Sequence, residues 1–228
     1  INEFEGDTLA GIGTAAVTVD IMSVISGNTI EIIVIELADA RLQFLVLNDG
    51  KANWDIVKPS ADSTAAAAEP SQFKVGLKRY AITRGRLLYD DKSLGFNMLL
   101  DNFDHGGRGD FTQDLFTFNT QTNAEALSMS YEGITYILEA KTEIIAEVEM
   151  DMVNSKYTFK QNEITLNKLG FGIDGFVAMP AEDIDMDLKF DVKQNDFKTF
   201  MSMIPGVYRE GFDNVQSSGK LAFNGFVK

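Results

Sequence analysis

The residues able to carry acid–base or nucleophilic chemistry in this sequence are few. His105 is the only histidine, and the chain contains no cysteine. A zinc site needs several His or Cys ligands, and a nucleophilic triad needs a histidine close to a Ser or Cys. We therefore expect His105 to be a solvent-exposed residue of a glycine-rich loop over residues 102–110. The sequence predicts neither an enzyme nor a cofactor.

Three aspartates at alternate positions, Asp183, Asp185 and Asp187, imitate the first ligands of a calcium-binding loop. Such a loop also needs glycine at its sixth position and glutamate at its twelfth. Leu188 and Gln194 stand at these two positions. The aspartates therefore indicate the solvent-facing side of a β-strand, and the sequence predicts no metal site.

Glycines at positions 170, 172 and 175 imitate a phosphate-binding loop. A phosphate-binding loop leads into a helix, and no helical pattern follows these glycines. Glycine inside a strand commonly marks a bend or a bulge. We predict a bend or bulge in a strand at this point.

The composition argues against two classes of partner. The 228 residues include 20 basic and 34 acidic side chains, which gives a formal net charge of −14. Nucleic-acid binding needs a basic stripe that neutralises phosphates, and docking on anionic lipid needs a polybasic patch. Both are disfavoured here. Apolar residues make up 45% of the chain and include 17 Phe, enough for a large core or a lined cavity.

The ends of the sequence point to a longer parent protein. The chain begins at Ile1, contains no signal peptide and has no apolar run of about 18 residues, the length of a membrane-spanning helix. We expect any anchor or targeting segment to lie outside this chain. The absence of cysteine leaves the compartment open.

The clearest early strand signals are the runs 30–37 and 41–47, followed by the turn-forming sequence Asn-Asp-Gly at 48–50. In the second run apolar residues alternate with others, the period of a half-buried strand. Asn-Asp-Gly supplies the positive φ angles of a tight turn. These features predict a β-hairpin, preceded by a strand over 15–24.

Beyond residue 73 the chain is a succession of alternating segments, clearest over 144–152 and 184–192, with one turn predicted at Arg84-Gly85. Alternation places apolar side chains on one face of a sheet and acidic side chains on the other. We predict a mainly β fold, in the form of a large antiparallel curled sheet.

An apolar face cannot stay in water, so three architectures are open: packing on a second sheet, closure into a barrel, or a groove that holds another apolar molecule. The side chains that would line such a groove are Phe96, Met98, Leu100, Phe116, Phe118, Ile144, Val148, Met150, Met152, Ile184, Met186, Leu188 and Phe190.

One segment, 196–204, has the helical spacing i, i+3, i+4, i+7. Asn195 or Asp196 can cap its start, and Pro205-Gly206 ends it. We predict a short amphipathic helix that either plugs one end of the sheet or simply packs on it. Its apolar stripe consists of Phe197, Phe200, Met201 and Ile204.

Two motifs carry a resemblance to a known family. The first is Ile30-x-Ile32-x-x-Ile35-x-Leu37-x-x-Ala40-x-Leu42, which runs into Asn48-Asp49-Gly50-Lys51-Ala52-Asn53-Trp54-Asp55-Ile56. The second is Ile82-x-x-Gly85-x-Leu87-x-Tyr89-x-Asp91, with a further such element at Gly219-Lys220-Leu221-Ala222-Phe223-Asn224-Gly225. The chain resembles the AsmA family of bacterial envelope proteins, although the membrane helix that begins that family is missing here.

The resemblance implies a protein anchored in the inner membrane, with its bulk in the periplasm and a role in outer-membrane biogenesis. More distantly, it implies a likeness to chorein-type bridge-like lipid transfer proteins, whose β-sheet units form an apolar groove. The expected ligand is a phospholipid or another acyl-chain lipid, and envelope proteins are expected partners. A structural or assembly scaffold with a dry core is the alternative.

The resemblance also implies a division of the chain. Residues 1–58 form an AsmA-like N-terminal β module, and 73–228 a β-repeat region that continues the same sheet. The segment between them, 59–72, is small, acidic and bracketed by prolines, which predicts a flexible linker.

Overall fold

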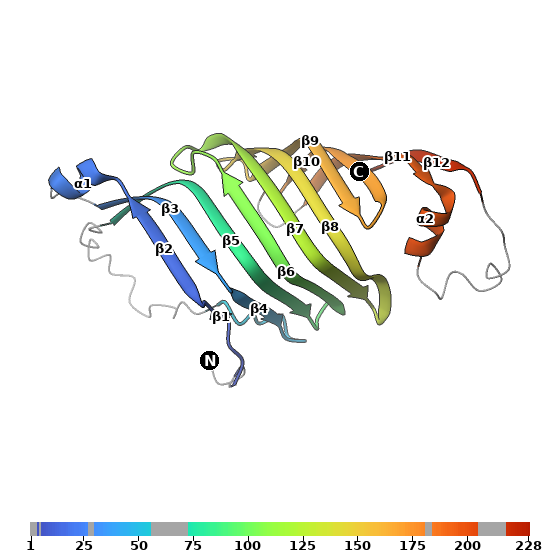
Figure 1. Ribbon diagram of the computed structural model, residues 1–228, viewed down its shortest axis with the longest axis horizontal. Helices are drawn as coiled ribbons and strands as arrows, with labels where there is room; N and C mark the ends of the chain where they lie inside the picture. The colour runs from blue at the N-terminus through green and yellow to red at the C-terminus, as the bar shows by residue number, and fades with distance from the viewer. Residues whose placement is uncertain (1–3, 5, 27–29, 56–72, 181–183, 205–217) are drawn as a thin grey trace.

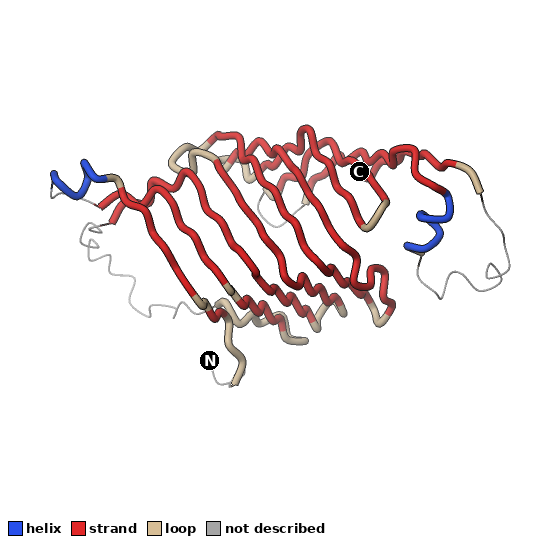
Figure 2. The backbone as a smooth tube through the Cα atoms, viewed as in Figure 1, coloured by secondary structure: helices blue, strands red, loops and turns tan. Residues whose placement is uncertain are grey.

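The structure is a computed structural model that describes residues 4, 6–26, 30–55, 73–180, 184–204 and 218–228 (Figure 1). The described residues form one sheet and two short helices, α1 (Ile21–Ser26) and α2 (Phe197–Met203) (Figure 2). The strands are β1 (Ala10–Gly11), β2 (Thr14–Val19), β3 (Ile30–Ala38), β4 (Arg41–Val46), β5 (Phe73–Asp91), β6 (Phe96–Arg108), β7 (Leu115–Tyr131), β8 (Ile134–Asp151), β9 (Lys156–Leu166), β10 (Leu169–Ala178), β11 (Asp185–Asp196) and β12 (Lys220–Val227).

From β5 to β12 each strand pairs antiparallel with the next one in the chain. The sheet is open, and in Figure 1 it curls so that part of β9–β12 passes behind the front strands. This confirms the predicted mainly β fold with one large curled sheet. Three strands have 17 to 19 residues, about three times the usual length.

The start of the sheet is not purely antiparallel. β3 and β4 lie end to end along the same side of β5, and both run parallel to it. The runs 30–37 and 41–47 therefore do not pair with each other as a hairpin. The turn at 48–50 is confirmed, since Gly50 N donates to Leu47 O at 2.9 Å. A parallel return needs a long connection, which the chain between β4 and β5 supplies.

The predicted linker 59–72 lies outside the described residues. Strands from before and after it belong to one sheet, because β3 and β4 both pair with β5.

The two faces of the sheet differ in chemistry. In antiparallel pairs the residues opposite each other point to the same side, so the register Leu87–Leu100–Leu127–Ala140 traces one apolar row across four strands. We call this side the apolar face. The other side, the polar face, carries exposed ion pairs. Examples are Arg79–Glu36, Arg86–Asp101 and Lys160–Glu149.

A line of bulges crosses the sheet at mid-strand. Asp39, Arg84, Asn102 and Glu139 all have φ between 43° and 55°, and the β7–β8 register shifts after Ala124. Bulges increase local twist and bend a strand, so neighbouring bulges act together to curl the sheet. The turn predicted at Arg84-Gly85 is wrong, because both residues belong to this bulge inside continuous strand β5.

The most buried side chains of the described residues lie beside this bulge line. Ala40, Phe103, Ala124, Ala140 and Thr142 are each less than 5% exposed. Small side chains let the bent strands approach closely, and the single ring of Phe103 fills the space over Gly85. The core of the molecule is therefore a narrow band along the bend rather than a layer between two sheets.

The strand predicted over 15–24 is only partly correct. β2 ends at Val19, and Asp20 then caps α1, with its Oδ1 accepting from Ser23 N at 2.9 Å. A local cap of this kind competes with strand pairing, and here it ends the strand.

The predicted second helix is confirmed. α2 begins at Phe197 after Asp196, whose side chain accepts a hydrogen bond from Lys198 N at 2.8 Å.

Candidate functional site

Most of the predicted lining residues share the apolar face. Direct pairs include Phe116 with Met150 and Phe118 with Val148. The members on this face by register are Phe96, Met98, Leu100, Phe116, Phe118, Ile144, Val148, Met150, Met186, Leu188 and Phe190.

Two predicted members do not belong to it. Met152 follows the end of β8 and is 50% exposed, and Ile184 precedes β11 and is 64% exposed. Alternation in the sequence continues past the point where pairing stops, so the pattern alone could not exclude them.

Most side chains of the apolar face are only partly shielded from solvent. Of the lining residues on this face, Val148 is buried and the others, including Phe116, Phe118 and Met150, are half-buried. Residues between two packed sheets would be largely buried. All described strands belong to one open sheet, so in this part of the chain neither a second sheet nor a closed barrel covers the face.

An aromatic cluster lies at one end of the long strands. The Tyr80 ring stacks on Phe118 at 6.2 Å between centroids, and Phe111 lies 5.1 Å from Phe116 and 5.6 Å from Phe118. Phe111 reaches the face because the chain after β6 stays bonded to β5, with Gly109 N donating to Lys78 O at 3.0 Å and Phe111 N donating to Leu77 O at 3.3 Å. This end of the face is therefore lined by aromatic rings.

His105 lies within this cluster. Its Nε2 is 2.7 Å from the Tyr80 hydroxyl, and its Nδ1 is 2.8 Å from Thr122 Oγ1. Burial lowers the pKa of His105 and raises the pKa of Tyr80. The expectation of a solvent-exposed loop histidine is wrong, because β6 continues to Arg108 and carries His105 on the apolar face.

The sequence does contain a signal for this placement. Phe96, Met98 and Leu100 stand at alternate positions, and Phe103 and His105 continue this spacing one residue out of phase. The bulge at Asn102 accounts for the slip.

A second aromatic cluster lies at the opposite end of β5. Trp54 contacts Phe44 at 5.6 Å and Tyr89 at 6.2 Å, and Tyr89 contacts Phe96 at 5.9 Å. Asn53 fixes the segment that carries Trp54, since its side chain accepts from Leu45 N and donates to Gln43 O.

Helix α2 contacts the β11–β12 end of the apolar face. The Phe200 ring lies 5.5 Å from Phe223, which in turn lies 6.3 Å from Phe190. The other members of the predicted stripe, Phe197, Met201 and Ile204, are half-buried. The helix thus contacts the sheet through Phe200, one of the predicted side chains.

Several rings on the apolar face lie directly over glycines. A Cβ at Gly85 would stand 2.6 Å from the Phe103 ring, and a Cβ at Gly107 would stand 2.6 Å from both Phe118 and Tyr80. Glycine at these positions lets large rings lie close to the backbone, so that the rings extend the apolar surface along the sheet.

The three glycines at 170, 172 and 175 lie in β10, as predicted. The β9–β10 register shifts between Phe171 and Gly175. Asp185 and Asp187 lie in β11, whereas Asp183 lies outside the described residues. In the described part of the chain no group of three or more His, Asp or Glu side chains could hold a metal ion.

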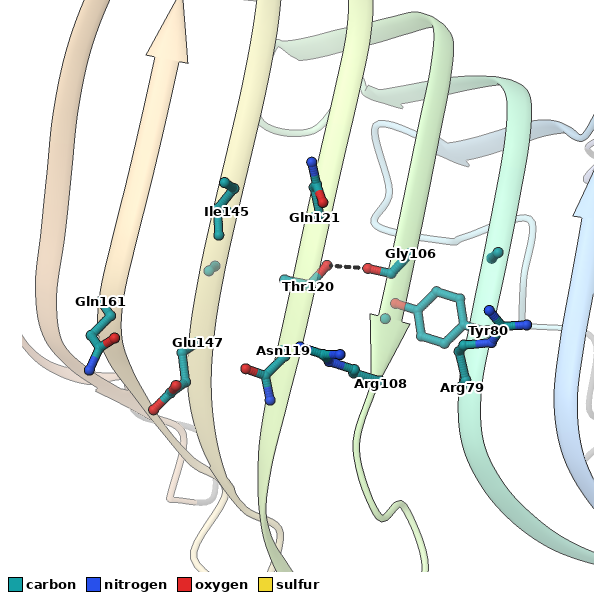
Figure 3. A pocket seen from close by; sticks show the side chains of 13 residues that line it. Arg79, Tyr80, Gly106, Arg108, Asn119, Thr120, Gln121, Ile145, Glu147 and Gln161 are labelled. Carbon is teal, nitrogen blue, oxygen red and sulfur yellow. Dashed lines mark hydrogen bonds between the residues drawn. The ribbon is translucent and has the colours of Figure 1, made fainter.

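The polar face has a shallow hollow of about 450 Å³ that crosses β5 to β9 (Figure 3). Arg79, Arg108, Asn119 and Glu147 form one row along it by register. Arg79 is held by Glu36 at 2.7 Å. The hollow exists because the neighbouring row contains Gly106, whose carbonyl accepts from Thr120 Oγ1 at 3.1 Å.

Comparisons with models of protein families, with curated proteins and with solved structures found no match to this chain. Neither described helix has the length and apolarity needed to span a membrane.

Proposed function

We propose that this chain is a non-enzymatic lipid-binding segment whose apolar face holds acyl chains. The observation that supports it most directly is a face of Phe, Met, Ile and Leu that continues across many strands and remains half-exposed. A monomeric soluble protein rarely leaves so large an apolar surface in water unless it binds something there.

The energetics favour an acyl chain as the occupant. Removing one CH₂ group from water is worth about 0.8 kcal/mol, so a full chain contributes on the order of 10 kcal/mol. Only a continuous apolar surface can replace water over that length. The long strands β5, β7 and β8 offer one, and the exposed ion pairs on the polar face keep the other side in water.

The wider role follows from the resemblance to the AsmA family. On that basis the chain is a periplasmic segment of an inner-membrane-anchored envelope protein that takes part in lipid transport and outer-membrane biogenesis. The motif Asp49-Gly50-Lys51-Ala52-Asn53-Trp54-Asp55 carries this part of the proposal. In the structure it forms the turn and the segment that holds Trp54 against Phe44.

The test is native mass spectrometry of the purified chain, followed by lipid extraction. We expect co-purified phospholipid or fatty acid. Met98→Asp places a charge on the apolar face and should reduce the bound lipid at least severalfold. Asn97→Asp, one residue away on the polar face, is the matched control and should leave it unchanged. Absence of lipid from the unmodified chain, or equal loss in both variants, would overturn the proposal.

A scaffold role is the second candidate, supported by the sheet edges. Among the described strands β2 pairs only with β3, and β12 pairs only with β11. Unpaired edges are templates for added strands from another protein. Cross-linking that captures an envelope protein at β12, from a chain that carries no lipid, would favour this role over lipid binding.

A further inference from the structure

Helix α1 has an unusual arrangement of side chains, with its aliphatic residues directed away from the protein. Ile21, Met22, Val24 and Ile25 are 65%, 67%, 43% and 70% exposed. At 3.6 residues per turn they occupy an arc of about 160° around the helix. In Figure 1 the helix projects beyond β2 and β3 at one corner of the sheet.

The polar side of the helix is bonded to the protein. Ser23 Oγ donates to Asp20 O at 2.7 Å and accepts from Glu31 N at 2.9 Å. Ser26 Oγ donates to Ser23 O at 2.9 Å. Both hydroxyls of the helix therefore have internal partners, and no side chain of residues 21–26 is charged. This helix can leave water without losing a side-chain hydrogen bond, which is the requirement for entering an apolar medium.

We propose that α1 is an insertion tip that docks this corner of the sheet on a zwitterionic phospholipid bilayer. The inference goes beyond acyl-chain binding by the apolar face and does not depend on it, since α1 and that face are separate surfaces. The four side chains enter the interfacial region, and the serine-bonded side stays against the sheet.

The size of the tip favours a bilayer over a protein partner. A stable protein interface buries about 800 Å² on each partner. Four aliphatic side chains supply on the order of 400 Å². A bilayer has no such threshold, because each side chain that inserts contributes separately.

Charge selects the kind of bilayer. The chain has a net charge of −14, so an anionic surface repels it. The tip itself is uncharged, which suits an uncharged, zwitterionic surface. Binding should therefore withstand high salt, unlike binding through a basic patch.

The absence of cysteine makes a site-specific test simple. Met22→Cys is labelled with an environment-sensitive dye (NBD), and Val153→Cys, at a 73% exposed site in the turn after β8, is the matched control. On addition of dioleoylphosphatidylcholine vesicles we expect a blue shift and a severalfold gain in emission at position 22 and no change at position 153. No response at position 22, or the same response at both positions, would overturn the inference.

Vesicle flotation provides the second readout. Ile25→Asp should reduce the vesicle-bound fraction by about tenfold or more, because burying one aliphatic side chain is worth at least that factor. Val153→Asp should bind as the unmodified chain does. Equal flotation of Ile25→Asp and the unmodified chain would contradict the inference, and so would binding only to anionic vesicles.

Light scattering tests the remaining alternative, that α1 contacts a second copy of the chain instead of a bilayer. A dimer that Ile25→Asp converts to a monomer would show that α1 contacts a second copy, and would overturn membrane docking. The proposed lipid-binding function is tested separately, by Met98→Asp on the apolar face. Either proposal can therefore fail without the other.

Discussion

At the scale of single residues, the apolar face depends on rings that lie over glycine backbones. Gly107 is the clearest case, because it separates two rings from strands far apart in the sequence, Tyr80 on β5 and Phe118 on β7. Those rings stack across β6 only if β6 offers no Cβ at this point.

Gly107→Ala should therefore destabilise the fold. The added Cβ would stand 2.6 Å from both rings, and the overpacking should cost about 1 to 3 kcal/mol in the free energy of unfolding. Urea denaturation measures it. Gly170→Ala is the control, because nothing lies within 4 Å of its Cβ position, and its effect should stay within about 0.5 kcal/mol. Equal effects at both sites would refute the role assigned to the rings.

The burial of His105 should make stability depend on pH. Its folded-state pKa lies below the ordinary value of 6.5, so at and below pH 6.5 the unfolded state binds more protons than the folded state. Stability should be complete well above pH 6.5 and should decrease as the pH falls below 6.5, until the pH reaches the lowered pKa of the folded state. Tyr80, the titratable group bonded to the ring, stays neutral throughout, since burial raises its pKa.

Two measurements check this expectation. NMR titration of the single imidazole gives the pKa of His105 directly, and urea unfolding at several pH values gives the slope. His105→Gln should flatten the slope over this range. A measured pKa at or above 6.5 would contradict the assignment. The hydrogen bond from Lys78 lowers the pKa of Asp110 to about 2. Asp110 therefore affects stability only at a lower pH than His105 does.

At the scale of elements, α2 combines a local signal with a tertiary contact. Asp196 caps the first turn, and the Phe200 ring packs on Phe223 of β12. A seven-residue helix is marginal alone, so cap and packing must act together to hold it.

Asp196→Ala should loosen α2 without unfolding the sheet. Loss of an N-cap costs about 1 kcal/mol, which corresponds to about a fivefold loss of amide hydrogen-exchange protection over the helix. Hydrogen exchange read by mass spectrometry resolves this segment. Asp185→Ala, at the exposed start of β11, should leave protection of the helix unchanged. Unaltered protection in Asp196→Ala would show that packing alone holds the helix.

The bulge line is the element-scale feature that limits prediction. Asp39 and Arg84 are far apart in the sequence, yet both have positive φ and form a bidentate contact at 2.8 Å. A one-residue slip in alternation looks like a turn when one strand is considered alone. This explains why Arg84-Gly85 was expected to be a turn and why residues 102–110 were expected to be a loop.

At the scale of the whole molecule, charge opposes compactness. A net charge of −14 creates repulsion across the sheet, and exposed ion pairs such as Arg84–Asp39 contribute little individually. Raising the salt from about 0.01 M to about 0.15 M shortens the screening length to about 8 Å.

The thermal midpoint should therefore rise with salt over this range. Calorimetry in sodium chloride and in choline chloride should give the same increase, because screening does not depend on the cation. Glucose at equal osmolality controls for solute exclusion and should give a smaller increase. A midpoint that falls with salt would show that the ion pairs outweigh the net repulsion.

The sequence by itself determined most of the strands, the two faces and the α2 helix. These features have local patterns, each of which matches one secondary structure. Period-two alternation in segments such as 144–152 matches a strand, and the i, i+3, i+4 spacing after Asp196 matches a helix. Tertiary structure alone decided how β3 and β4 run along β5 and whether the apolar face is covered. Each of these depends on residues far apart in the chain meeting in one sheet, and no local pattern encodes that meeting.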